Sequence, residues 1–181
     1  MIDHLKYEIA FNRNENAFHQ LFVKVHSSLL KFCLIYINDK SLSEEIVSDV
    51  MLNLWLMEER LGEIENLKSY LFRSVKNRAI NYLTNIRKFT EWDIDNISLV
   101  HSIDNYSPEF ISIEKEYLKE VLKKIEALPP QCQLVFKLIR EYGLSYKQVS
   151  EILDISPKTV DRHLQIAMQK LSEIFQHKRK K

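Results

Sequence analysis

The sequence predicts an all-α protein made of two small helical domains joined by a linker. It holds only two glycines and four prolines among 181 residues, and sheet-rich folds need both types for tight hairpins and βα turns. Apolar residues recur at helical spacing on both sides of one stretch without clear periodicity, residues 89–113. We therefore expect a first domain at 1–88, a linker at 89–113 and a second domain at 114–181.

The first domain shows three amphipathic segments, which together can enclose one small core. The segment 15–37 carries its apolar residues at Phe18, Leu21, Phe22, Val25, Leu29, Leu30, Phe32 and Leu34. A second helix starts near Ser41 or Ser43, either of which can cap it, and it buries Leu42, Ile46, Val47, Val50, Leu54 and Met57. The third, 67–88, repeats one apolar stripe of Leu67, Leu71, Val75, Ala79, Leu83 and Ile86.

The second domain has sharper boundaries. A helix over 118–128 stops before Pro129-Pro130, and the next, over 134–142, is closed by Gly143 in a left-handed conformation. Residues 145–148 have capping-box spacing and open a short helix that ends at Leu153. After the turn 154–156, Ser156 can cap a last helix that has Pro157 at its first position. That helix buries Val160, Leu164, Ala167, Leu171, Ile174 and Phe175.

Charge is distributed in blocks, although the formal net charge is only +1. Residues 39–65 carry 2 basic and 8 acidic groups, whereas 66–88 carry 6 basic groups and no acid. Residues 89–113 carry 5 acids and no base, and 157–181 carry 7 basic and 2 acidic groups. Screening acts over about 8 Å at physiological salt. A polyanion could therefore bind either basic block, although solvated helix faces would show the same pattern.

The short helix, three-residue turn and capped helix of the second domain form a predicted helix-turn-helix. Such a helix fits the major groove of DNA and presents side chains near its N-terminal end to the bases. Val160 and Leu164 should point inward. The residues expected at the outer side are Ser156, Lys158, Thr159, Arg162, His163, Gln165 and Ile166. A helical hairpin that binds nothing is the alternative.

Several function classes are excluded or disfavoured. Two glycines cannot make a glycine-rich phosphate loop. Cys33 and Cys132 are far apart and lie near no histidine cluster, so we expect no disulfide framework, metal site or cofactor. The six histidines are dispersed, and we expect no enzyme and no small-molecule substrate. Because the chain shows neither a signal peptide nor an apolar run of membrane-spanning length, we expect a cytoplasmic protein.

Three motifs, in the order and spacing of one family, resemble bacterial extracytoplasmic-function sigma factors of the sigma-70 family. The second domain resembles region 4 at residues 128–136 (LPPQCQLVF), 143–149 (GLSYKQV) and 156–160 (SPKTV). Region 2.2 is similar to residues 44–55 (EEIVSDVMLNLW), and regions 2.3 and 2.4 are similar to residues 70–83 (YLFRSVKNRAINYL). The family has a tryptophan early in region 2.3, where this chain has Tyr70. The resemblance implies a three- to four-helix bundle for region 2 and a helix-turn-helix for region 4.

The resemblance also implies a role for each segment. The protein would bind core RNA polymerase, recognise promoter DNA and assist its melting. Region 2 would bind the β′ coiled coil of the polymerase through Asp49, Leu52, Asn53 and Trp55, and would read the −10 element as an opened strand through Tyr70, Arg73, Lys76, Asn77, Arg78 and Asn81. In this interpretation Asn77 and Asn81 contact bases, the three cations contact phosphates, and Phe72 and Tyr82 are further aromatic candidates for stacking. Region 4 would read the −35 duplex and dock on the β flap. An anti-sigma factor, membrane-anchored in many relatives, would be a further partner.

Other interpretations remain open from the residues alone. Tyr82 could belong to the core, and the acidic block 39–65 could be only a solubilising face. A LuxR-type response regulator shares the C-terminal motif, but its receiver domain is a parallel sheet, and residues 1–88 show no parallel-strand runs. A helical enzyme or a helical adaptor that binds only protein would not start transcription when mixed with core polymerase and a promoter.

Overall fold

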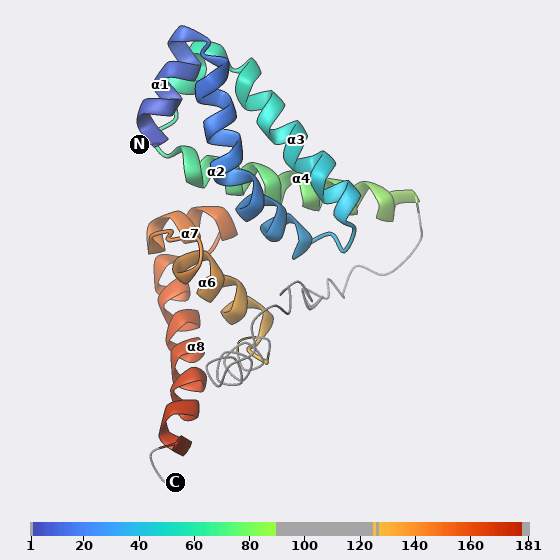
Figure 1. The fold of residues 1–181 in the computed structure, drawn as a ribbon. Helices are drawn as coiled ribbons and strands as arrows, with labels where there is room; N and C mark the ends of the chain where they lie inside the picture. Colours follow the sequence, from blue (N-terminus) through green and yellow to red (C-terminus); the bar gives the residue numbers. More distant parts are fainter. Residues whose placement is uncertain (1, 90–124, 126, 179–181) are drawn as a thin grey trace, which may run out of the picture. The chain divides into compact units, whose positions relative to one another are not determined.

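The described part of the chain consists of helices and contains no strand, which confirms the predicted fold class. A computed structural model describes residues 2–89, 125 and 127–178 (Figure 1). The chain divides into two compact units, residues 1–101 and 102–181. The predicted linker, most of the helix predicted over 118–128 and the end of the basic tail lie outside the described residues.

In its described residues, unit 1 is a bundle of four α-helices and one short 3₁₀ helix, within the range that the resemblance implied. Its elements are α1 (Ile2–Asn12), α2 (Glu15–Leu34), α3 (Lys40–Leu56), η1 (Glu58–Glu63) and α4 (Leu67–Phe89). Helices α2 and α3 pack side by side, and α4 crosses both of them (Figure 1). Neither α1 nor η1 was expected from the sequence.

The N-terminal helix α1 packs on η1 and α2. Lys6 Nζ donates a hydrogen bond of 2.7 Å to the carbonyl oxygen of Ile64, just after η1. The ring of Phe11 lies so close to Gly62 that a Cβ added there would be 2.7 Å from Phe11 Cζ. A side chain at position 62 would therefore displace the Phe11 ring, which is 50 % exposed, whereas glycine lets the ring lie against η1.

The core of unit 1 follows the predicted stripes, with one correction at the start of α3. The largest fully buried side chains of the unit are Ile9, Leu21, Leu29, Phe32, Met51, Leu54, Leu61, Leu67, Leu71 and Phe72. Cys33 is also fully buried. Neither Ser41 nor Ser43 caps α3: Asp39 does so, because its Oδ1 accepts from the Leu42 N–H at 3.0 Å. Ser43 is buried and its hydroxyl lies 3.3 Å from the Ile37 carbonyl oxygen, to which it donates.

Unit 2 holds α6 (Pro130–Arg140), α7 (Tyr146–Leu153) and α8 (Pro157–Lys178). Helix α8 packs against both α6 and α7, and one cluster of its core joins Ile125, Leu128, Cys132, Ala167 and Leu171. Gly143 follows α6 with φ 62°, the left-handed conformation predicted for it. The predicted starting points of α7 and α8 are both confirmed.

Candidate nucleic-acid interface

Helices α7 and α8 form the predicted helix-turn-helix, and each of its boundaries has a local cause. Ser145 and Gln148 make a reciprocal capping box at the start of α7. Asp154 ends α7 in a left-handed conformation (φ 56°, ψ 41°), which aspartate tolerates better than most residues. Ser156 Oγ then accepts from the Thr159 N–H at 3.0 Å, so it caps α8 as predicted.

Helix α8 presents a polar stripe on the side away from its buried face. Val160 and Leu164 are buried, with 0 % and 6 % of their surfaces exposed. Lys158, Arg162 and Gln165 are exposed at spacings of four and three residues, so they share one face. We call these three residues the α8 stripe. Gln169, also exposed, continues it by one turn; the same spacing could have identified it in the sequence.

The structure corrects the orientation expected for other α8 residues. His163 is half-buried, with Nδ1 3.4 Å from Cys132 Sγ on α6. Ile166 is half-buried because it packs against the core cluster of unit 2. Thr159 is half-buried too, and its hydroxyl lies 2.8 Å from that of Ser156. These side chains hold α8 in place more than they extend its outer face.

Helix α4 presents a second stripe, in which amides predominate. Arg73, Asn77 and Asn81 are exposed at four-residue intervals and so lie along one face, which we call the α4 stripe. Tyr70 is half-buried, and Tyr82 has 38 % of its surface exposed, so Tyr82 is not a core residue. Asn66 caps the helix, since its Oδ1 accepts from the Ser69 N–H at 2.9 Å.

Three other residues predicted for α4 do not lie free on its surface. Phe72 is 1 % exposed and its ring lies 5.0 Å from that of Phe32, edge to face, so the expectation that it stacks on bases is wrong. Lys76 is only 9 % exposed. Arg78 donates from Nη1 to Asp49 Oδ2 at 2.7 Å, which joins a residue predicted for DNA to one predicted for the polymerase.

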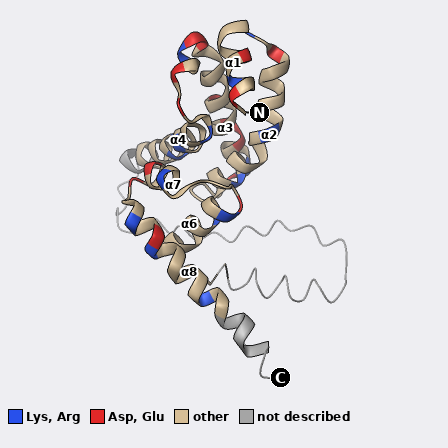
Figure 2. Ribbon diagram, turned by 90° about the vertical axis from the view of Figure 1, so that its left-hand side faces the viewer, with Lys and Arg blue, Asp and Glu red and all other residues tan. Residues whose placement is uncertain are grey.

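The outer face of α3 carries most of the residues predicted to contact the polymerase. Leu52 is 55 % exposed, and Asp49 and Asn53 are exposed beside it. Leu56, 57 % exposed, lies on the same face one turn further and was not predicted. Acidic positions of α3 are coloured red on the ribbon in Figure 2.

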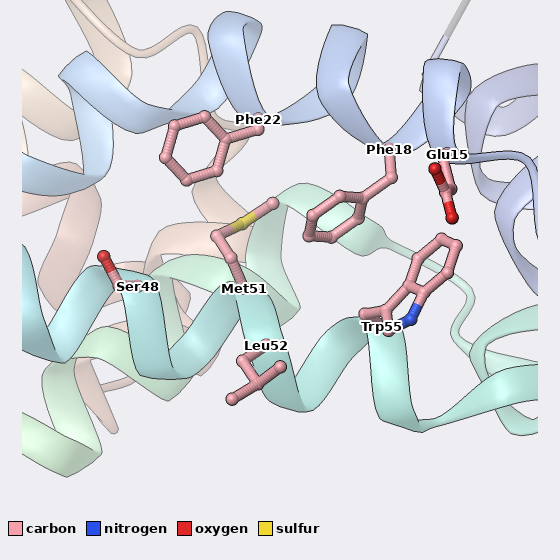
Figure 3. A pocket seen from close by; sticks show the side chains of 7 residues that line it. All are labelled: Glu15, Phe18, Phe22, Ser48, Met51, Leu52 and Trp55. Atoms are coloured by element: carbon pink, nitrogen blue, oxygen red, sulfur yellow. The ribbon is translucent and has the colours of Figure 1, made fainter.

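Trp55 is turned from this face toward the start of α2. Its ring lies 5.1 Å from that of Phe18, and the Arg13 guanidinium lies over it at 4.1 Å. Arg13 also donates to the Trp55 carbonyl oxygen at 2.6 Å. Trp55 thereby closes one end of an open apolar groove of about 390 Å³ between α2 and α3 (Figure 3), lined by Glu15, Phe18, Phe22, Ser48, Met51, Leu52 and Trp55. The sequence indicated Phe18 and Phe22 only as core residues.

Burial shifts the pKa of several groups among the described residues. Burial lowers the pKa of Lys68 on α4 and raises the pKa of the Cys33 and Cys132 thiols, which makes both thiols poor nucleophiles. Among the residues that the structure describes, no three His, Cys, Asp or Glu side chains lie close enough together to hold a metal ion. None of the helices searched there is long and apolar enough to cross a membrane.

Comparisons with known proteins cover both units. Residues 21–89 match the family model "Sigma-70 region 2", and residues 118–171 match "Sigma-70, region 4". A structure of CnrH in complex with the cytosolic domain of CnrY is similar, with a TM-score of 0.57 and 18 % identity over 97 % of each chain. So is the Bartonella quintana sigma factor RpoE in complex with the anti-sigma factor NepR, with a TM-score of 0.61 and 18 % identity over 88 % of this chain and 96 % of that one. A search of curated protein sequences found no significant match.

Proposed function

The chain belongs to the sigma-70 family of RNA polymerase sigma factors, and from this premise we propose how its two units recognise a promoter. A sigma factor directs core RNA polymerase to promoter DNA; it is a specificity subunit and its family is not an enzyme family. We propose that unit 1 binds the polymerase and reads the −10 element as an opened strand, and that unit 2 reads the −35 element as duplex. The domain boundaries proposed are 1–88, 89–113 and 114–181.

The proposal for the −35 element depends on one observation, the exposed α8 stripe on a capped helix-turn-helix. Arg162 can donate two hydrogen bonds to O6 and N7 of a guanine, the commonest specific contact in the major groove. Lys158 and the free N–H groups at the start of α8 favour a phosphate close by. His163, Ser156 and Thr159 support the position of α8, and Ile166 contributes through packing.

The α4 stripe supports recognition of the −10 element as a single strand. Amide side chains can donate to and accept from base edges that are exposed only when the strands separate. Asn77 and Asn81 would contact bases, Arg73 would contact a phosphate, and Tyr70 or Tyr82 would stack on a base. Holding an opened strand in this way would assist melting. Lys76 and Arg78 would add positive charge near the strand. They would not contact it directly, because Lys76 is buried and Arg78 is paired with Asp49.

The outer face of α3 supports a docking site for the β′ coiled coil. Leu52 and Leu56 offer apolar area, and Asp49 and Asn53 offer polar groups at its edge. An exposed apolar patch with a polar rim is typical of a protein interface. Trp55 would not contact the coiled coil directly; it would close one end of the groove that Leu52 also lines. Unit 2 would dock on the β flap.

An anti-sigma factor is the second protein partner that we propose. RpoE, which has a similar fold, was solved in complex with the anti-sigma factor NepR. The similar CnrH was solved with the cytosolic domain of CnrY, and a separate cytosolic domain is what a membrane-anchored regulator would have. Such a partner would compete with the polymerase.

Transcription in vitro tests the proposed function. The full chain is mixed with core RNA polymerase and a promoter library, and the RNA 5′ ends are sequenced. We expect starts at a defined promoter class only when the chain is present. Lys158→Ala/Arg162→Ala should weaken selection at the −35 element, most at the base pair that Arg162 reads, while Lys147→Ala on α7 serves as the control for loss of a cation. Starts that do not depend on the added chain would overturn the proposal.

A further inference from the structure

An acidic side chain lies on the helix that we propose reads duplex DNA. Asp161 is half-buried on α8, between Lys158 and Arg162 in the sequence. Gln165, one turn further and exposed, donates from Nε2 to Asp161 Oδ2 at 2.9 Å. A carboxylate so close to a DNA-facing stripe repels phosphates. Asp161 therefore does not increase the affinity of α8 for the DNA backbone, and its hydrogen bond to Gln165 indicates a different role.

The carboxylate restricts the orientation of the Gln165 amide. An ionised carboxylate only accepts hydrogen bonds, whereas an amide has a donor end and an acceptor end. Only the Nε2 end of Gln165 can therefore face Asp161, because the opposite flip would set two acceptor oxygens against each other. This leaves Oε1 and the second Nε2 hydrogen available to a ligand.

One base matches the groups that remain. A glutamine that offers one acceptor and one donor side by side pairs with N6 and N7 of adenine in the major groove. We propose that Asp161 is a positioning residue that holds Gln165 to read an adenine of the −35 element. The inference rests on the proposed function and goes beyond it by assigning a base and a second residue that determines specificity.

The spacing of Arg162 and Gln165 on α8 predicts where this adenine lies relative to the guanine proposed above. Gln165 lies three residues after Arg162 on the same face, which is about 4.5 Å along the helix axis. Base pairs are stacked about 3.4 Å apart. The adenine should therefore lie next to the base pair that Arg162 reads.

Selection from a library randomised over the −35 element tests the inference, with the full chain bound to core polymerase. For the wild-type chain we expect a preference of about 5- to 150-fold for adenine at one position. Gln165→Ala should remove that preference. Asp161→Asn should lower it several-fold, because an amide at 161 can pair with either end of Gln165, while the preference at the Arg162 position remains. Glu151→Gln, an exposed acid on α7, is the control for the change of charge.

The outcomes separate this inference from the function on which it rests. If Asp161→Asn keeps the full adenine preference that Gln165→Ala loses, Asp161 does not position Gln165 and the inference fails. If Asp161→Asn changes the preference at a different base pair, Asp161 contacts a base itself and the inference also fails. If the wild-type chain shows no preference anywhere in the −35 element, the proposed function fails. Equal circular dichroism melting curves for all variants would exclude loss of folding as the cause.

Discussion

The helices α4 and α8 both carry basic sequence blocks, yet they expose different chemistry. On α8 both cations of the stripe, Lys158 and Arg162, are exposed. On α4 the structure buries Lys76 and pairs Arg78 with Asp49, so that Arg73 and two amides remain on the stripe. A duplex reader approaches a dense phosphate backbone, whereas a reader of an opened strand must pair with base edges. The difference indicates that a count of charges overstates how many cations α4 has available for phosphates.

Substitution of Phe72 should have the largest effect and should separate the core of α4 from its stripe. Phe72→Ala should lower the free energy of unfolding of unit 1 by about 3–5 kcal/mol, because it removes a buried ring packed on Phe32. Tyr82→Ala on the same helix should change stability by less than about 0.5 kcal/mol and weaken strand binding instead. Urea unfolding followed by circular dichroism measures the free energy of unfolding of both variants. Equal losses of stability would mean that the two rings have the same role.

Removal of Arg162 tests whether α8 reads bases. Arg162→Ala should cost about 1–3 kcal/mol of discrimination at one base pair of the −35 element, the value of a bidentate contact. Competition binding of holoenzyme to promoters that differ at single positions measures this loss. Arg140→Ala, at the end of α6, is the matched control. An unchanged sequence preference in Arg162→Ala would remove Arg162 from base reading.

A smaller effect is expected from the α4 stripe. Asn77→Ala should weaken the open complex by about 0.5–1.5 kcal/mol, the net value of one hydrogen bond, with little effect on binding to closed duplex. Permanganate reactivity of promoter thymines measures strand opening, and Asn16→Ala on α2 is the control. The prediction fails if promoter thymines are equally reactive with the mutant and the wild-type protein.

Breaking the Asp49–Arg78 ion pair should give the smallest effect. It compares Arg78 on α4 with and without its carboxylate partner. Asp49→Asn frees Arg78 from its carboxylate, so the slope of log affinity against log salt for a single strand should steepen by about 0.7 if one more phosphate is bound. Stability should fall by no more than about 1 kcal/mol, since the pair is partly exposed. Glu45→Gln removes the same charge from α3 without touching α4. The pairing has no influence on strand binding if both variants keep the wild-type slope.

How far the sequence predicts each unit depends on where its determinants lie. In unit 2 they are local: Gly143, Ser145, Asp154 and Ser156 each set a boundary through a hydrogen bond or a backbone conformation within a few residues. The boundaries of α7 and the start of α8 could therefore be predicted residue by residue. Such local sequence patterns can be interpreted without knowing how the core packs.

In unit 1 the determinants join distant residues. Periodicity alone could not show that Phe72 packs on Phe32, that Arg78 reaches Asp49 across 29 positions, or that Arg13 covers Trp55. Helix α1 was missed because side chains such as Lys6 and Phe11 make their contacts with η1 and the residue after it, which the sequence pattern does not show. The segments of α2, α3 and α4 were predictable, but not the groove and the ion pair that arise between them.

Each unit contains one of the two cysteines of the chain, Cys33 and Cys132, and both are buried. A thiol-specific reagent attacks the thiolate, and burial keeps both groups protonated and covered. Alkylation must then wait for a local opening of the surrounding helices. Peptide mapping after timed alkylation would report how often each half of the intact molecule opens, with no label introduced by mutation.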